Sequence, residues 1–273
     1  MKTALIILNR PEDAAGLLAV GLDVVARAGG AALNVLAARE PPEDTILPTE
    51  EMLTDRTRAQ IRATQRQWAD SLHACFHDWL TAGRADGAIG NVEVNWLDPE
   101  ISVTRMMQAY ASEADLIVLG FPQPHDSDQK RRAVHAAIFD SGRPVVFVPP
   151  GWNRPAGRNI LLAWKDTTSC RRTVRSARPI LAAARDVAVL RADTDTPSVL
   201  TDLLAGVVAR YLPPLDDGAP EDVTRVILRQ CRDNGCDLLV MGGYTHGALY
   251  NRLVGSVTQD ILECGEIPVF LQH

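Results

Sequence analysis

Short apolar runs alternate with longer amphipathic segments along this chain. The short runs are typical of buried β-strands, and the longer segments carry apolar residues at three- and four-residue steps, as one face of a helix does. The clearest helical stripe lies within residues 50–82, where Ile61, Trp68, Leu72 and Phe76 recur at this spacing. Strands that alternate with helices imply a parallel sheet built from crossover connections.

The pattern predicts two successive sets of elements, separated by a linker of prolines and glycine over 149–155. Before the linker we expect strands at 3–8, 32–37, 92–97, 115–119 and 144–148, and helices at 11–28, 50–82, 99–112 and 130–139. After it we expect strands at 159–163, 187–190, 211–215, 237–241 and 267–271, and helices at 168–184, 197–209, 221–234 and 255–264. The strand at 211–215 is the weakest of these, because two prolines interrupt it.

The two sets read as an internal repeat. The segments "ADLIVLG" and "CDLLVMG" occupy matching places, and "GRPVVFVPP" and "EIPVFLQH" close the two sets. We therefore expect two α/β domains, 1–150 and 151–273, each with a five-stranded parallel sheet and helices on both faces. The last strands, at 145–148 and 268–271, are both apolar, so each is expected to cover the other's edge in an antiparallel, pseudo-twofold pair.

Composition narrows the class of protein. Among 273 residues, 28 are basic and 34 acidic, so a net charge of −6 predicts no general attraction for nucleic acid or anionic lipid. The one basic cluster, Lys130-Arg131-Arg132, reads as a solvated helix face. Five cysteines, an odd number in a long chain, fit reduced thiols better than a disulfide scaffold. Without an apolar run of signal-peptide or membrane-span length, we expect a cytoplasmic protein.

The stretch "MGGYTHGALYNRLVGSVTQD", residues 241–260, is the most informative for function. A strand followed by a glycine loop and a helix N-terminus makes a place where an anion can bind, because glycine permits close backbone approach and the helix start offers free N–H groups. The alternative is a tight strand-to-helix turn that binds nothing, in which Ser256 serves only as an N-cap.

On these segments, together with "GRNILLAWKD" and the terminal "IPVFLQH", the chain resembles the universal stress protein family in its tandem, two-domain form. The resemblance covers essentially the whole chain. It implies two Rossmann-like domains of the adenine nucleotide alpha hydrolase type, paired through their last strands, with a homodimer as a further assembly. It also implies a role in stress tolerance, with adenine-nucleotide binding (ATP or AMP, with Mg²⁺) in many members.

Nucleotide-binding members of that family carry Gly-x-x-Gly, nine residues, and then Gly-Ser or Gly-Thr. On this sequence the pattern falls on Gly242, Thr245 and Gly255-Ser256, so the spacing is kept and threonine replaces the second glycine. Threonine disfavours a positive φ, which predicts a different loop path. The expected nucleotide contacts on this side of the site are Met241, Gly242, Gly243, Thr245, His246, Gly255, Ser256, Val257 and Thr258.

The loop after the strand at 159–163 should form the other edge of this site, through Ala163, Trp164, Lys165 and Asp166. In nucleotide-binding relatives an acid after this strand meets the adenosine, a role that Asp166 would take one position late. Lys165 would meet phosphates. The alternative is an exposed loop with a neighbouring pair of opposite charges, and Trp164 reads better as a packing residue than as a base-stacking one.

The first domain is not expected to cradle phosphate. Pro122 and Pro124 stand where glycines would be, and Asn9-Arg10-Pro11 supplies no acid after the first strand. His73 and His77 share a helix face, which reads as solvated or half-buried rather than as a metal site. The sequence shows no Walker loop, nucleophile elbow or Gly-x-Gly-x-x-Gly, so we expect no dedicated enzyme and at most slow ATP hydrolysis.

Two functions of different classes remain. The leading one is a stress-response protein that signals through adenine-nucleotide occupancy of its second domain. The alternative is a nucleotide-independent module of the same fold that works through protein–protein contact.

Overall fold

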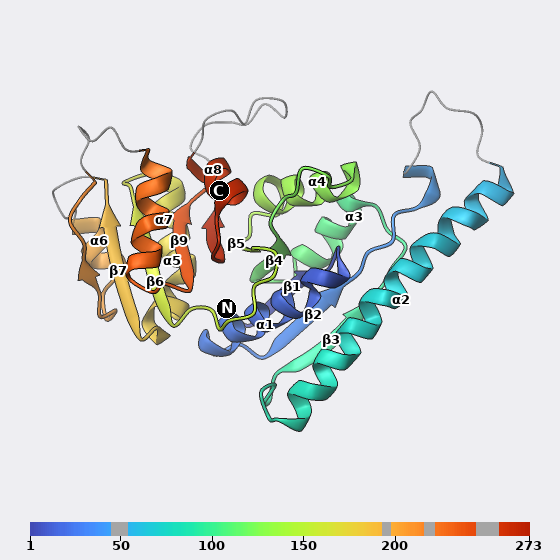
Figure 1. The fold of residues 1–273 in the computed structure, drawn as a ribbon, viewed down its shortest axis with the longest axis horizontal. Coiled ribbons are helices and arrows are strands. Elements are labelled where there is room, and N and C mark those ends of the chain that lie inside the picture. Colours follow the sequence, from blue (N-terminus) through green and yellow to red (C-terminus); the bar gives the residue numbers. More distant parts are fainter. Residues whose placement is uncertain (45–53, 193–197, 216–221, 244–256) are drawn as a thin grey trace.

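The computed structural model describes residues 1–44, 54–192, 198–215, 222–243 and 257–273. Ten strands in these residues form one sheet in the order β3-β2-β1-β4-β5-β10-β9-β6-β7-β8. Neighbouring strands run parallel except at the centre, where β5 and β10 are antiparallel. We call β1–β5 with their helices the first half and β6–β10 with theirs the second half (Figure 1).

The first half contains five strands and the helices between them. Its strands are β1 Thr3–Ile7, β2 Ala32–Leu36, β3 Glu93–Leu97, β4 Leu116–Gly120 and β5 Val145–Val148. Its α-helices are α1 Pro11–Arg27, α2 Asp55–Ala85, α3 Val103–Met106 and α4 Asp128–His135. A short 3₁₀ turn, η1 Pro42–Asp44, and two π-helical segments, η2 Met107–Ala111 and η3 Ala136–Asp140, complete it.

The second half repeats this alternation. Its strands are β6 Asn159–Trp164, β7 Asp186–Arg191, β8 Arg210–Tyr211, β9 Leu238–Gly242 and β10 Val269–Gln272. Its helices are α5 Thr168–Ala183, α6 Ser198–Leu203, α7 Val223–Asp233 and α8 Val257–Cys264.

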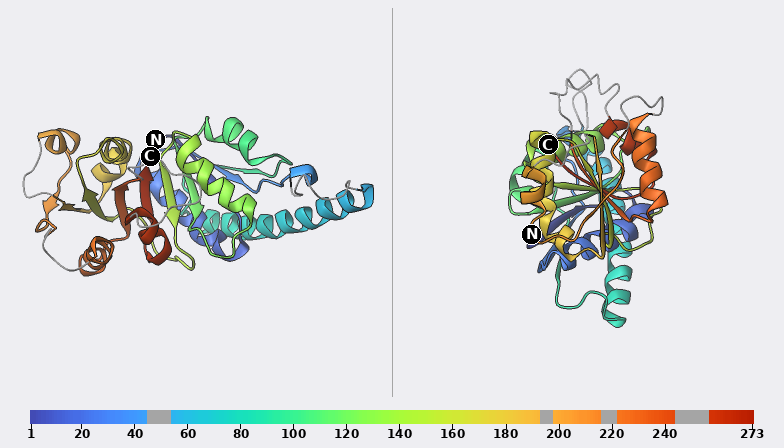
Figure 2. Two further views of the ribbon diagram at one scale, coloured as in Figure 1. Left: turned by 90° about the horizontal axis from the view of Figure 1, so that it is seen from above. Right: turned by 90° about the vertical axis from the view of Figure 1, so that its left-hand side faces the viewer.

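Helices lie on both faces of the sheet (Figure 2). In each half the first three strands advance in one direction and the last two lie on the opposite side of the first strand. Because crossovers between parallel strands are right-handed, the direction of advance decides which face each helix covers. Thus α1, α2, α5 and α6 belong to one layer, in which α1 lies against α5 across the centre, and α3, α4, α7 and α8 belong to the other. Strands covered on both faces read as continuous apolar runs, as β4 and β5 do.

The antiparallel joint between the halves confirms the sequence prediction. Val146 pairs with Phe270, and the flanking pairs are Val145 with Leu271 and Phe147 with Val269. This register is symmetric about the Val146–Phe270 pair, so a pseudo-twofold axis passes through it. Phe147 and Phe270 are fully buried, and burial of each such side chain stabilises the fold by roughly 1.5–3 kcal/mol.

Gln272 is the polar residue of this apolar joint and is only 6% exposed. Its side chain accepts a hydrogen bond from the Ser176 hydroxyl at 2.7 Å and donates one to the Gly142 carbonyl of the first half at 3.0 Å. Its backbone N–H donates to the Thr173 hydroxyl at 3.0 Å. One buried side chain therefore ties α5 to the turn that precedes β5.

The linker between the halves is packed against α1. Trp152 is buried, and its carbonyl oxygen lies only 2.6 Å from where a Cβ on Gly16 would stand. The Asp23 carboxylate accepts a hydrogen bond from the Ala156 N–H, and the Arg27 Nε–H donates to the Ala156 carbonyl, each at 3.1 Å. The linker is thus held to α1 through both the N–H and the carbonyl group of Ala156, and it is not a free spacer.

Several predicted elements differ in their bounds. The helix expected over 197–209 ends at Leu203, and Gly206 nearby has φ +82°, which an α-helix cannot include. The strand expected over 211–215 shrinks to Arg210–Tyr211, because the prolines that follow cannot donate to a ladder. The helices expected over 99–112 and 130–139 each end in a π-helical segment. The predicted helix starts at 50, 197, 221 and 255 lie outside the described residues.

Candidate functional site

Each half has one place where the connections from adjacent strands run in opposite directions, between β1 and β4 and between β6 and β9. Open α/β sheets bind ligands at the carboxyl ends of the strands at such a switch point. The two places are equivalent in register, since Ile6 pairs with Val118 in the first half and Leu162 with Val240 in the second. Counting forward along the chain, Arg10 and Asp166 therefore stand at equivalent positions.

In the second half the structure brings the two expected edges of the site together. Ala163 pairs with Met241, so the chain segments that leave β6 and β9 start side by side. Gly242 is required by packing here, because a Cβ would lie 2.9 Å from the backbone nitrogen of Cys170 in α5. The Gly243 N–H donates to the Gln272 carbonyl at 3.1 Å. These two glycines thus let α5 and β10 approach the end of β9 closely.

Lys165 and Asp166 follow β6 and are both exposed. The Asp166 carboxylate accepts two hydrogen bonds from the Arg171 guanidinium, at 2.5 and 2.8 Å. This bidentate pair holds the pKa of Asp166 below its ordinary value. The carboxylate proposed to meet adenosine is therefore engaged by a neighbour on α5 in this structure.

Trp164 is buried at the end of β6 and packs within the core. In register it falls beside Gly242, whose missing Cβ points at α5, so the Trp164 side chain lies on the α5 face of the sheet. Its indole N–H has no hydrogen-bond partner among the described residues. The position agrees with a packing role.

The other side of the predicted site is described only in part. Val257 and Thr258 begin α8, and Thr258 is buried. Thr245, His246, Gly255 and Ser256 lie outside the described residues. Their contacts with a nucleotide stay predictions from the sequence.

The cysteines offer no activated thiol at this place. All five are free, and Cys170 is buried beside the end of β9. Burial raises the pKa of the Cys170 thiol, and it raises that of Cys236 to about 11. Because the thiolate is the nucleophilic form and a raised pKa keeps the thiol protonated at neutral pH, Cys170 and Cys236 are not activated nucleophiles. Their buried side chains serve packing.

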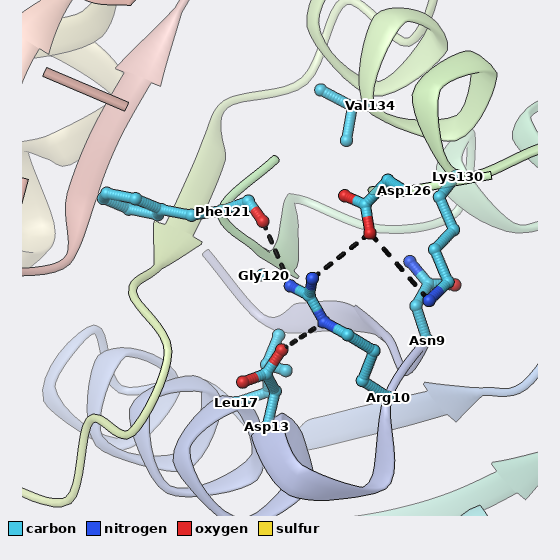
Figure 3. Close-up of a pocket in the computed structure, with 9 residues that line it drawn as sticks. All are labelled: Asn9, Arg10, Asp13, Leu17, Gly120, Phe121, Asp126, Lys130 and Val134. Carbon is cyan, nitrogen blue, oxygen red and sulfur yellow. Dashed lines mark hydrogen bonds and ion pairs between the residues drawn. The ribbon is translucent and has the colours of Figure 1, made fainter. Parts of the chain in front are cut away.

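The switch point of the first half forms a small pocket (Figure 3). The Arg10 side chain, from the segment between β1 and α1, is part of its lining. Its Nε donates to Asp13 at 2.5 Å, its Nη1 lies 3.2 Å from Asp126, and its Nη2 donates to the Phe121 carbonyl at 3.1 Å. Asn9, Leu17, Gly120, Lys130 and Val134 complete the lining.

Sequence reasoning noted that no acid follows β1 and missed this cluster. A partial signal was present, because Asp13 stands three residues after Arg10 in the first turn of a helix, where such pairs meet. Asp126 could not be found in this way, since it lies 116 residues further along the chain.

The two histidines of α2 lie on the exposed surface of the helix. The His73 ring stands edge-on to Trp96 of β3, with 4.9 Å between ring centroids, and Phe76 also contacts that indole. His77 is exposed. This arrangement agrees with the expected solvated or half-buried face.

Comparisons with known proteins define the fold. No protein-family model and no curated protein matches the sequence. Among solved structures, a universal stress protein from Archaeoglobus fulgidus DSM 4304 aligns with 98% of this chain and 94% of its own, at a TM-score of 0.63 and 13% identity. A functionally unknown protein from Pseudomonas aeruginosa PAO1 aligns with 100% of this chain and 92% of its own, at a TM-score of 0.54 and 15% identity.

The cytoplasmic domain of a prokaryotic cation chloride cotransporter is also similar, with a TM-score of 0.54, 10% identity, and 99% and 95% of the two chains aligned. The chain therefore has the α/β fold of the tandem universal stress proteins, as the sequence resemblance implied. That fold also occurs as a domain of a transporter. Among the described residues, no helix combines the length and the apolar character needed to cross a lipid bilayer.

Proposed function

We propose that this chain is a cytoplasmic stress-response protein of the universal stress type that binds an adenine nucleotide at the switch point of its second half. The observation that carries the proposal is that Ala163 pairs with Met241, so the chain leaves β6 and β9 side by side, and Gly242-Gly243 follow Met241 directly. It stands where open α/β proteins take their ligands.

The roles follow from the chemistry of the residues. Backbone N–H groups after Gly242 and at the start of α8 would bind the phosphates of ATP or AMP, with Lys165 nearby as a counter-charge. Asp166 would accept hydrogen bonds from the ribose hydroxyls, with its ion pair to Arg171 either kept or broken on binding. Mg²⁺ would arrive with the phosphates.

We also propose that residues 1–150 and 151–273 are separate domains and that occupancy of the second is the signal read by other proteins. A homodimer is the further assembly that the family resemblance suggests.

The second candidate is a nucleotide-independent interaction module. It is favoured by the packing of Gly242 under Cys170, which gives that glycine a purely structural role. The similarity to a transporter's cytoplasmic domain shows the same fold in a different setting.

Mass spectrometry of small molecules released from the purified, denatured protein separates the two. Bound ATP, ADP or AMP near one equivalent per chain supports the first candidate. If no nucleotide is released and calorimetric titration with millimolar ATP and Mg²⁺ gives no binding heat, the nucleotide proposal is wrong and the nucleotide-independent interaction module is supported.

A further inference from the structure

The guanidinium of Arg10 makes a polar contact through each of its three nitrogens inside the first half. Each of its three nitrogens has its own acceptor, namely the Asp13 carboxylate, the Asp126 carboxylate and the Phe121 carbonyl, at 2.5, 3.2 and 3.1 Å. The acceptors come from the first turn of α1 and from the segment after β4, and they converge on one planar group (Figure 3). Three acceptors around one group suit the rigid, planar set of N–H donors of a guanidinium better than the compact charge of an ammonium.

The acceptors are themselves fixed and buried. The side chains of Asp13 and Asp126 are each 8% exposed, and that of Arg10 is 17% exposed. The second oxygen of Asp126 accepts a hydrogen bond from the Gln123 N–H at 2.7 Å, and Lys130 lies 3.9 Å from its first oxygen. These contacts hold the Asp126 carboxylate in place independently of Arg10.

Gly120 completes the fit at the end of β4. A Cβ added there would stand 3.1 Å from Nη2 of Arg10 and 3.5 Å from the Asp13 carboxylate. In the second half the equivalent Gly242 makes room for the backbone of α5 at Cys170. A glycine at the equivalent position thus makes room for a side chain in the first half and for a helix backbone in the second.

We propose that the switch point of the first half is a guanidinium site and that Arg10 is its resident ligand. An anionic ligand entering there would have to displace Arg10 and face two buried carboxylates, which is unfavourable on both counts. The first half is therefore closed to anionic ligands such as nucleotides. The proposal does not depend on whether the second half binds a nucleotide.

Chemical rescue tests it. In Arg10→Ala the Asp13 carboxylate and the Phe121 carbonyl lose this partner, while Asp126 keeps Lys130 at 3.9 Å. The melting temperature should fall by roughly 10 °C. Guanidinium chloride at a few millimolar, far below denaturing concentrations, should then raise the melting temperature of Arg10→Ala by several degrees and leave the parent unchanged. Sodium chloride and tetramethylammonium chloride at the same concentration should have no such effect. Arg131→Ala, which removes an exposed arginine paired with Asp128, is the matched variant that guanidinium should not rescue.

The proposal is overturned if Arg10→Ala melts with the parent, or if sodium chloride restores it as well as guanidinium does. Should Arg10→Ala fail to fold, Arg10→Lys decides the matter. That variant keeps the positive charge without the planar fork, so it should melt below the parent. An Arg10→Lys protein as stable as the parent would show that the site needs only a charge.

Discussion

Asp115 and Asp237 hold the first strand of each half at its start in the same way. Asp115 accepts hydrogen bonds from the backbone N–H groups of Lys2 and Thr3, at 2.5 and 3.2 Å. Asp237 accepts from those of Arg158 and Asn159, at 2.9 and 3.1 Å. The two carboxylates differ in their surroundings. The N–H groups it binds lower the pKa of Asp115, whereas burial, the larger effect at Asp237, raises the pKa of that group.

This difference predicts opposite pH dependences for two equivalent substitutions. A carboxyl with a lowered folded pKa stabilises the protein above its unfolded pKa of about 3.9, and the contribution is lost as pH falls through the folded value. Asp115→Asn should therefore reduce the free energy of unfolding by about 1 kcal/mol at pH 7 and by less at pH 3. Urea denaturation at the two pH values measures both effects.

Asp237→Asn should behave differently. A carboxyl with a raised folded pKa stabilises the protein below its unfolded pKa, and this is lost as pH rises through the raised value. The amide keeps an acceptor oxygen for both N–H groups and removes the half-buried charge. We expect this variant to be at least as stable as the parent at pH 7 in the same urea experiment. Parallel losses in both variants at pH 7 would contradict the assignment.

Gly242→Ala should be clearly destabilising. The new Cβ would meet backbone atoms of Cys170 at 2.9–3.0 Å, and a helix backbone cannot yield as a side chain can. A loss of roughly 1–3 kcal/mol is expected from such overpacking. Gly120→Ala is the matched comparison and should cost less, because its Cβ would meet side-chain atoms and no backbone, namely Nη2 of Arg10 at 3.1 Å and the Asp13 carboxylate at 3.5 Å. Equal losses in the two variants, measured by thermal unfolding, would argue against the α5 contact.

Gln272→Leu should weaken the joint between the halves. It leaves the Gly142 carbonyl and the Ser176 hydroxyl without this partner, at a cost of roughly 1–3 kcal/mol. Ser176→Ala removes only one of the two side-chain bonds, so it should cost less. Hydrogen exchange should increase around residues 142–145 in Gln272→Leu and much less in Ser176→Ala. Unchanged exchange in both variants would mean that the buried amide does not support the joint.

Nucleotide affinity should respond to substitutions in the family pattern. Thr245→Gly restores the glycine of that pattern and should strengthen ATP binding, whereas Gly255→Val should abolish it. Ser256→Ala should weaken it by roughly 1 kcal/mol or a little more, as loss of one hydrogen bond to a charged group allows. Asp166→Asn should lower affinity without changing the melting temperature, since its pair with Arg171 is exposed. Calorimetric titration of the four variants checks this. Absence of binding by both the parent and Thr245→Gly would end the nucleotide proposal.

Hydrophobic patterning predicted much of this fold because it records burial. The apolar runs at β5 and β10 implied strands that cover each other, and the structure pairs Val146 with Phe270. Patterning does not record which distant polar groups meet. Three strands, β2 to β4, lie between Arg10 and Asp126 in the sequence. Their contact therefore follows from the strand order, which places β4 beside β1, and from no local signal.

The same limit explains the other surprises. Gln272 reads as the polar end of a strand, and its burial depends on α5 and on the turn at Gly142. The linker reads as irregular because prolines and glycine lack periodicity, although α1 holds it through Asp23 and Arg27. In each case the partner is set by how elements pack after they form.

The central place of β10 has a consequence for the growing chain on the ribosome. β10 pairs with both β5 and β9, yet it is synthesised after the nine other strands. Until it emerges, Val145–Val148 is an apolar strand with an open edge, the kind of surface that recruits other unfinished chains. Arrival of the last strand therefore closes the most vulnerable edge of the sheet and joins its two halves in a single step.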